Sequence, residues 1–257
     1  MLILLDIGNT AVTYGICKLK VPGTLSNFGS CSYSDIPKIV SKCYSSGDLK
    51  QYSNIVISSV VPHITRKIRR LVKGKPCRLW VAGANLPIPL KHRYPKNQKP
   101  GPDRLVTLYG AFKLYKAPLV VIDFGTAITF DYLSAKGIFE GGMIIPGPEI
   151  AFQTLLSRAA LIPKNIRLPH KAKSFLGKNT YDCISSGVLQ GYGAMFDELI
   201  HRFKSKYSNK LKFIATGGFA KHLKPYTKTM TVIDPQLSIK SLHLLVMGSD
   251  PKKAFRV

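Results

Sequence analysis

The sequence predicts an α/β protein made of two copies of one unit, each a mixed five-stranded sheet flanked by helices, with a cleft between them. One observation is an internal match. Asp6–Tyr14 and Asp123–Phe130 share Asp, Gly, Thr, Ala, Val or Ile, Thr and an aromatic residue in order, with Asn9 as one extra residue. The other is the plan that follows each stretch: three strands, then alternating helices and strands. We therefore expect an N-terminal domain at 1–116 and a C-terminal domain at 117–257, as a chain of 257 residues allows.

In the first unit, apolar runs and helix-start signals define the elements. Strands are expected at 1–6, 11–18, 25–33, 55–59 and 77–81, and helices at about 34–45, from 62 onward and at 105–116. Pro62 suits the first turn of a helix, where its missing N–H costs nothing. The stretch 86–102 is rich in proline and lysine and has no periodicity. It therefore predicts a loop, and long ordered loops are usually functional.

The second unit repeats this plan. Strands are expected at 118–123, 127–133, 137–145, 211–215 and 231–233, and helices at about 148–158, 179–206 and 238–248. A second basic, proline-punctuated loop spans 159–178. Two glycine turns, Gly141–Gly147 and Thr216–Gly218, are either plain turns into helices or places where backbone amides face phosphate.

Each matched stretch predicts a β-hairpin that carries an acidic residue at its tip. In the second copy the tip holds Asp123, Gly125 and Thr126, and in the first copy Asp6 stands in the place of Asp123. A glycine lets backbone N–H groups approach a ligand closely. A carboxylate beside it can hold a cation that neutralises phosphate oxygens. Asp-x-Gly is also a common plain turn, so only the pair of hairpins indicates a polyphosphate site.

A third acidic residue lies where the first long loop meets a helix, in Gly101-Pro102-Asp103-Arg104. The ordinary interpretation of Asp103 is a helix N-cap, a position that aspartate favours. The alternative is a catalytic carboxylate beside a guanidinium that grips an anionic group. This tetrapeptide alone favours the cap.

Composition excludes several classes of protein. No apolar run is long enough to cross a membrane, and the N-terminus resembles a first strand rather than a signal peptide. Five scattered cysteines without a Cys-x-x-Cys pair argue for reduced thiols in a cytosol and against a zinc site. The net charge of +25 favours anionic partners, but no nucleic-acid motif accompanies it. We interpret the excess, including the cluster Arg66–Arg70, as a property of the solvated surface.

Taken together, these motifs resemble the type III pantothenate kinases of the acetate/sugar kinase, heat-shock chaperone and actin superfamily. The resemblance covers nearly the whole chain in order. It rests on Asp6-x-Gly-Asn-Thr10, Gly101-x-Asp-Arg104, Asp123-x-Gly-Thr-Ala127 with Thr129 and Asp131, Gly141–Gly147, Gly177-x-Asn-Thr180, Gly187, Thr216–Gly218 and Asp234-Pro235. The stretch Arg158–Pro163 matches less tightly, and we assign no role to Arg158.

The resemblance implies two duplicated ribonuclease H-like (actin-like ATPase) domains. It also implies a transferase, a cytoplasmic homodimer that phosphorylates pantothenate with ATP in the first step of coenzyme A biosynthesis. Asp103 would be the general base. The residues that would line the ATP phosphates are Asp6, Ile7, Gly8, Asn9, Thr10, Ala11, Val12, Thr13 and Thr126. Those that would hold pantothenate are Tyr94, Gly101, Pro102, Asp103, Arg104 and Thr180. Asp6 would help to place Mg²⁺, and Asp123 would ligate a monovalent cation, K⁺ or NH₄⁺.

Two alternatives stay open at this point. The first is a kinase of the same superfamily that acts on another small alcohol, such as a sugar, because the specificity pocket lies mostly in loops. The second is a kinase-like fold without turnover that regulates or binds nucleic acid. The charge favours the second alternative, whereas the presence of all three carboxylates opposes it, and we expect no nucleic-acid partner and no membrane.

Overall fold

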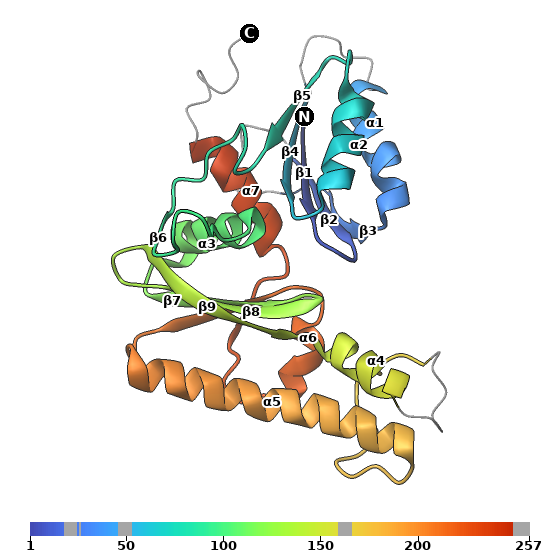
Figure 1. Cartoon of the computed structure of the whole chain (residues 1–257), viewed down its shortest axis with the longest axis vertical. Coiled ribbons are helices and arrows are strands. Elements are labelled where there is room, and N and C mark those ends of the chain that lie inside the picture. The colour runs from blue at the N-terminus through green and yellow to red at the C-terminus, as the bar shows by residue number, and fades with distance from the viewer. Residues whose placement is uncertain (18–24, 26, 46–52, 159–165, 249–257) are drawn as a thin grey trace. The chain divides into compact units, whose positions relative to one another are not determined.

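The computed structural model describes residues 1–17, 25, 27–45, 53–158 and 166–248 (Figure 1). They form two compact units. Unit 1 comprises Met1–Lys116 and the segment from Gln236 onward, and unit 2 comprises Ala117–Pro235. Part of the expected second loop, 159–165, lies outside the described residues.

Unit 1 contains a mixed five-stranded sheet in the order β3-β2-β1-β4-β5. Its strands are β1 (Leu2–Ile7), β2 (Val12–Cys17), β3 (Asn27–Cys31), β4 (Ser53–Ser59) and β5 (Cys77–Val81). β1 pairs antiparallel with β2 and parallel with β4, and β5 continues the parallel set. The carboxyl ends of β1, β4 and β5 therefore lie at one edge of the sheet, where ligands bind in open α/β folds.

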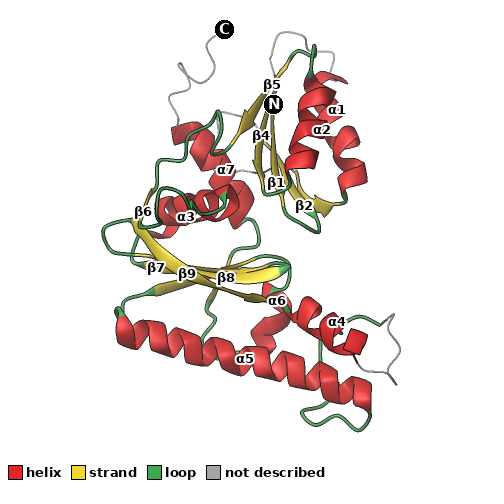
Figure 2. Cartoon of the chain, in the orientation of Figure 1, coloured by secondary structure: helices red, strands yellow, loops and turns green. Residues whose placement is uncertain are grey.

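Helices cover both faces of this sheet (Figure 2). α1 (Ile36–Ser45) and α2 (Pro62–Val72) pack on one face, and α3 (Pro102–Tyr115) and α7 (Leu237–Gly248) pack on the other. The alternation of β1 explains this arrangement, since Ile3 and Leu5 join the α1/α2 core while Leu2 and Leu4 join the α3/α7 core. Short pieces complete the unit: the 3-10 turn η1 (Tyr33–Asp35) and the two-residue strand β6 (Lys91–His92).

Unit 2 repeats the order as β11-β10-β7-β8-β9. Its strands are β7 (Leu119–Phe124), β8 (Ala127–Leu133), β9 (Ile138–Pro146), β10 (Lys212–Thr216) and β11 (Val232–Ile233). Its helices are α4 (Pro148–Arg158), α5 (Thr180–Lys206), α6 (Ala220–Leu223) and the 3-10 turn η2 (Lys224–Tyr226). Aromatic side chains fill its core, with Phe130 stacked at 5.4 Å on Phe196 of α5.

The two sheets are copies of one topology, as the internal match predicts. β1-β2-β3 and β7-β8-β9 are antiparallel meanders, and a parallel pair, β4-β5 or β10-β11, extends each first strand on its other side. Asp6 pairs with Thr13 across the first hairpin, and Asp123 pairs with Thr129 across the second. Both acidic residues therefore occupy the same place, one residue before the end of the first strand of their unit.

Two boundaries differ from the sequence-based prediction. The expected C-terminal domain, 117–257, included the last helix, but α7 packs on α3 and β1 and clusters with unit 1. The cause is its buried apolar surface together with Gly110 of α3, where any Cβ would overlap Ser241 of α7. The helix expected from 105 begins at Pro102, because Pro102 takes the first helical position.

Within the described ranges, no helix is both long and apolar enough to cross a membrane.

Asp197 on α5 is a structural carboxylate that fixes the turn before β11. Burial raises its pKa, but hydrogen bonds from the hydroxyls of Thr227 and Thr229 and from the N–H groups of Lys228 and Thr229 outweigh burial and lower the pKa to about 2. A lowered pKa means that the ionised carboxylate stabilises the fold above pH 4, and that this contribution is lost as the pH falls through 2.

We therefore expect Asp197→Asn to reduce the free energy of unfolding by about 2 kcal/mol at pH 7, measured by urea denaturation. The difference from wild type should shrink as the pH is lowered from 4 towards 2. The neighbouring exposed residue provides the control, because Glu198→Gln removes only a surface ion pair with Arg202 and should change the urea midpoint far less than Asp197→Asn does. A loss for Asp197→Asn that did not depend on pH would contradict this role of the carboxylate.

Candidate active site

Asp6 lies at the carboxyl end of β1, beside Ser58 on β4, with which it is in register. Burial, and to a lesser degree the negative charge of Asp103, raise the pKa of Asp6 to about 6, although hydrogen bonding from Ser238 and Ser58 acts to lower it. The buried Ser58 hydroxyl faces the carboxylate but does not reach regular hydrogen-bond geometry. All four residues belong to unit 1, so the two acidic residues meet within one unit.

The hairpin tip after Asp6 is an open turn. The N–H of Gly8 donates to the carbonyl of Ala11 at 3.1 Å, and the hydroxyl of Tyr33 donates to the carbonyl of Gly8 at 2.5 Å. Asn9, Thr10 and Ala11 are exposed. The predicted neighbours Ile7 and Val12 are fully buried in the core, so only their backbone groups can face a phosphate.

Asp103 lies in the first turn of α3, and Gly101 takes the N-cap position without a side-chain hydrogen bond. The N-cap interpretation of Asp103 is therefore wrong. Its Oδ1 atom is buried without a hydrogen-bond partner among the described residues. Oδ1 occupies the space that a Cβ at position 101 would need. Gly101 thus leaves room for a carboxylate oxygen that accepts no hydrogen bond in the described part of the chain.

A second pair of interacting side chains, Tyr94 and Arg104, comes from the same loop and helix. Arg104 donates from its guanidinium to the hydroxyl of Tyr94 at 3.2 Å, and its charge lies 5.9 Å from the Tyr94 ring centre. Tyr94, Gly101, Asp103 and Arg104, predicted as substrate contacts, thus lie close together on the loop before α3 and the first turn of that helix. Pro102 faces another side of the turn and lines a separate hollow.

The remaining predicted contacts belong to unit 2. Thr180 is the exposed first residue of α5, whose N-cap Asn179 accepts from the N–H of Asp182 at 2.9 Å. Thr126 is exposed at the tip of the second hairpin. Thr180 and Thr126 therefore lie outside the unit that carries Asp103.

The second hairpin has close backbone neighbours of its own. Gly217 has a positive φ of 86°, and a Cβ there would lie 2.5 Å from Oδ1 of Asp123. Thr216 is in register with Asp123, as Ser58 is with Asp6. A Cβ on Gly147 would lie 2.5 Å from the carbonyl oxygen of Thr126. Only glycine fits at these two positions, and the Thr216–Gly218 turn borders the Asp123 carboxylate.

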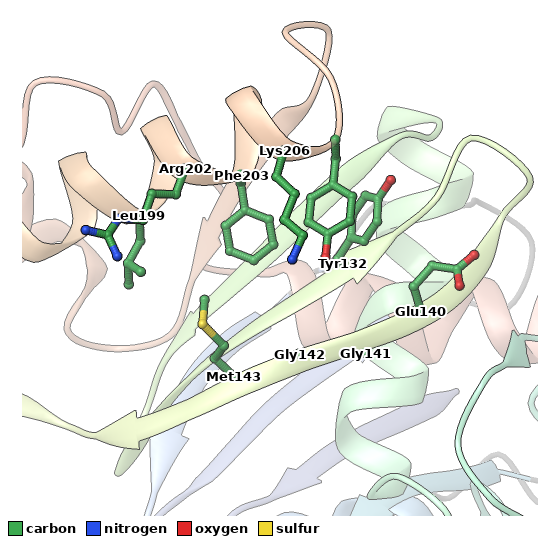
Figure 3. A pocket seen from close by; sticks show the side chains of 10 residues that line it. Tyr132, Glu140, Gly141, Gly142, Met143, Leu199, Arg202, Phe203 and Lys206 are labelled. Carbon is green, nitrogen blue, oxygen red and sulfur yellow. The ribbon is translucent and has the colours of Figure 1, made fainter.

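The Gly141-Gly142 pair, by contrast, lies inside β9 and not in a phosphate-facing turn. Figure 3 shows it beside a hollow that is lined by aromatic, basic and apolar side chains together with Glu140. The volume of this hollow is about 370 Å³. The rings of Tyr132 and Tyr207 pack there at a tilt of 33° with 4.4 Å between their centres, and Arg202 and Lys206 extend from α5. β9 ends at Pro146 and leads into α4.

Sequence reasoning missed Ser58 and Ser238. Ser58 carries a detectable signal, because a parallel pairing of β1 with the strand expected at 55–59 brings it beside Asp6. Ser238 had no such signal, since its helix was assigned to the other domain. It reaches Asp6 only because α7 returns to unit 1.

The Asp6–Asp103 pair fits a cation that is shared with a phosphate. Two carboxylates in one buried place repel each other, and a positive ion between them relieves that repulsion. Mg²⁺ is usually held by one or two carboxylates together with substrate phosphates and water. No cluster of three or more His, Cys, Asp or Glu side chains suited to a metal occurs among the described residues.

Because the pKa of Asp6 is raised, its ionisation opposes folding. The protonated form stabilises the ligand-free protein below pH 4, and this contribution is lost as the pH rises through about 6. We expect Asp6→Asn to increase the free energy of unfolding by about 1–3 kcal/mol at pH 8 without ligands, and to change it little at pH 4. Urea denaturation of the dialysed protein at both pH values tests this. An Asp6→Asn variant that is no more stable than wild type at pH 8 would contradict the raised pKa.

Comparison with known proteins shows which family this chain is similar to. Residues 2–202 match the model of the family described as type III pantothenate kinase. A type III pantothenate kinase from Desulforapulum autotrophicum is 32% identical over 254 residues, covering 95% of this chain and 96% of that protein. Such identity over almost the full length of both proteins shows a shared family.

Solved structures agree on the fold. A Campylobacter jejuni protein described as a Baf family transcriptional activator is similar with a TM-score of 0.59 and 20% identity, covering 96% of this chain and 98% of that one. A Sinorhizobium meliloti protein described as a 2-dehydro-3-deoxygalactonokinase reaches 0.57 with 11% identity, covering 98% and 97%. At these identities the likenesses show the fold alone, the duplicated α/β fold of sugar kinases and actin-like ATPases. On the family match and the full-length relative, the chain belongs to the type III pantothenate kinase family.

Proposed function

We propose that this protein transfers the γ-phosphoryl group of ATP to the primary hydroxyl of pantothenate, the first step towards coenzyme A. The observation that carries the proposal is the buried Oδ1 of Asp103, which has no partner in the described structure and lies near a second carboxylate, Asp6. This arrangement suits phosphoryl transfer, which needs positioned charge and one base more than covalent help from the protein.

In the proposed reaction, Asp103 acts as the general base. Oδ1 accepts the hydroxyl proton of pantothenate as the hydroxyl oxygen forms a bond to the γ-phosphorus, and the bond from that phosphorus to the β,γ-bridging oxygen breaks to release ADP. Gly101 supports this role by leaving space for the carboxylate. Asp103 needs no protein donor to hold it, because the substrate hydroxyl is its intended partner.

We assign the substrate contacts to the residues around this base. Arg104, positioned by Tyr94, would pair with the pantothenate carboxylate, and the N-terminal turn of α3 would hold its polar chain. Thr180 would complete the pocket. The exposed tip 8–11 of the first hairpin and Thr126 of the second would face the ATP phosphates.

Two cations complete the proposed site. Mg²⁺, placed by Asp6 through its hydration shell or directly, would neutralise phosphate charge when bound. A monovalent cation, K⁺ or NH₄⁺, would bind at Asp123, beside the close backbone approach of Gly217. We propose that the anions bound by this basic protein are ATP and pantothenate rather than nucleic acid. We also propose that the protein works in the cytoplasm.

We expect Asp103→Asn to lower kcat by about 10²–10⁴-fold, because general-base catalysis contributes on that order. ATP binding should stay within about threefold of wild type or tighten, since a negative charge near Asp6 is removed. ADP release with and without pantothenate and K⁺ measures turnover, and calorimetry measures ATP binding. Glu198→Gln, which removes a carboxylate from the exposed face of α5, is the control and should keep full activity. An Asp103→Asn enzyme within fivefold of wild type would refute the assignment of the base.

We further propose a homodimer formed by unit 2. Large apolar side chains are exposed on β9, on α4 and before α5: Met143, Ile144, Ile150, Leu155, Phe175 and Leu176. Ile144 is 61% exposed and Phe175 is 73% exposed. Contiguous exposed apolar patches usually mark an interface, and we propose that these side chains form such a patch.

A charge in the proposed interface should dissociate the dimer. We expect Ile144→Asp and Phe175→Asp each to raise the dissociation constant of the dimer at least tenfold in sedimentation velocity, because an isolated charge resists burial. Leu114→Asp places the same charge at an exposed apolar position of α3 in unit 1 and should leave association unchanged. A wild-type protein that sediments as a monomer at all concentrations would overturn the proposal.

A further inference from the structure

A hollow of about 450 Å³ lies in unit 1 at the carboxyl ends of β4 and β5. Its walls come from the end of β4, one side of α2, the turn after β5 and the start of α3. This position favours a ligand-binding site, because open α/β sheets bind ligands at the carboxyl ends of their parallel strands. Its size is that of a small-molecule site.

Three cations surround this hollow. Arg66 and Arg69 extend from α2, and Lys99 comes from the loop before α3. All three are exposed, and none forms an ion pair within the part of the chain that the structure describes. Arg66 and Arg69 are three residues apart and therefore share one face of α2. Two guanidinium groups on one face can each offer paired N–H donors to the oxygens of one phosphate.

The rest of the lining is mostly apolar. Val81, Ala82, Ile88, Pro100 and Leu105 contribute to it. The polar side chains Ser59 and Thr65 are already hydrogen-bonded to each other at 2.9 Å. An occupant would therefore place a charged head on the arginines and an apolar body against the strand ends and α3.

The hollow lies on a different side of α3 from the candidate active site. Pro102 and Leu105 line it, and residues three apart share a helix face. Asp103 and Arg104 come between them in sequence, so at 3.6 residues per turn their side chains leave the helix on the opposite side. Neither of these two residues lines the hollow.

We infer that this hollow is a second anion site, which binds a small organic phosphate with an apolar body at the same time as the substrates occupy the active site. The site gives a role to Arg66 and Arg69, two members of the basic cluster on α2 to which the kinase reaction assigns none. The inference does not depend on the reaction that the protein catalyses, because it concerns binding alone.

Hexyl phosphate is a suitable probe, because it combines a phosphate head with an apolar chain. We expect calorimetry at about 0.15 M salt to show one binding site on the full-length protein. The double variant Arg66→Gln/Arg69→Gln should weaken binding at least tenfold. The double variant Lys67→Gln/Arg70→Gln removes the same charge at the same spacing from exposed residues of α2 outside the hollow, and it should stay within twofold of wild type. Equal weakening by both double variants would show a general charge effect and overturn the site.

Further binding experiments test which class of ligand the hollow binds and whether the hollow is separate from the active site. Ala84→Trp, at an exposed position on the rim, should block hexyl phosphate through bulk while leaving the cations in place. Hexanol and inorganic phosphate should each bind at least tenfold more weakly than hexyl phosphate, and inorganic phosphate binding equally well would refute the need for an apolar body. Saturating pantothenate should change the affinity for hexyl phosphate less than threefold, whereas competition would show that the hollow belongs to the substrate pocket. None of these results requires turnover, so failure of the proposed reaction would be seen separately.

Discussion

The burial of the Asp6 carboxylate close to a second carboxylate, that of Asp103, is the constraint on which the active site of unit 1 depends. Burial and the nearby negative charge together raise the pKa of Asp6 to about 6, so the ligand-free protein holds this site at a cost in free energy. The surrounding features make the arrangement possible. Ser58 and Ser238 stabilise the charged form of Asp6, and Gly101 gives the carboxylate of Asp103 its space. A ligand that brings positive charge recovers part of this cost, which links cation binding to the stability of the unit.

The two copies of the fold each place an aspartate near the end of their first strand, but the surroundings of the two aspartates differ. Asp123 stands where Asp6 stands, and Thr216 stands where Ser58 stands, each pair in register across parallel strands. The helix that follows the last strand of the sheet is α3 in the first copy and α7 in the second, and both helices pack in unit 1. The first hairpin thus places Asp6 near a second carboxylate, that of Asp103. The second hairpin places Asp123 beside the backbone turn at Gly217.

Much of this architecture could be predicted from local signals. Both hairpins, β5 and α4 follow from apolar runs bounded by glycine and proline, which are properties of neighbouring residues. The sequence could not show that α7 packs in unit 1, because this packing depends on the close contact between Gly110 and Ser241, which are far apart in sequence. Ser238 was therefore not predicted as a site residue, because its helix was assigned to the C-terminal domain. The role of Asp103 was ambiguous for a similar reason: the sequence favoured a cap, and only the helix start at Pro102 and the unpartnered Oδ1 exclude it.

The most direct test of this account is a carbon-13 NMR titration of the Asp6 carboxyl group in the ligand-free protein, for wild type and for Asp103→Asn. The account predicts a pKa of about 6 in wild type, and a clear decrease when the charge at position 103 is removed. It also predicts a decrease when Mg²⁺ and ATP are added to wild type. A pKa near the ordinary value of 3.8 in wild type, unchanged in the variant, would show that the two carboxylates do not share a site.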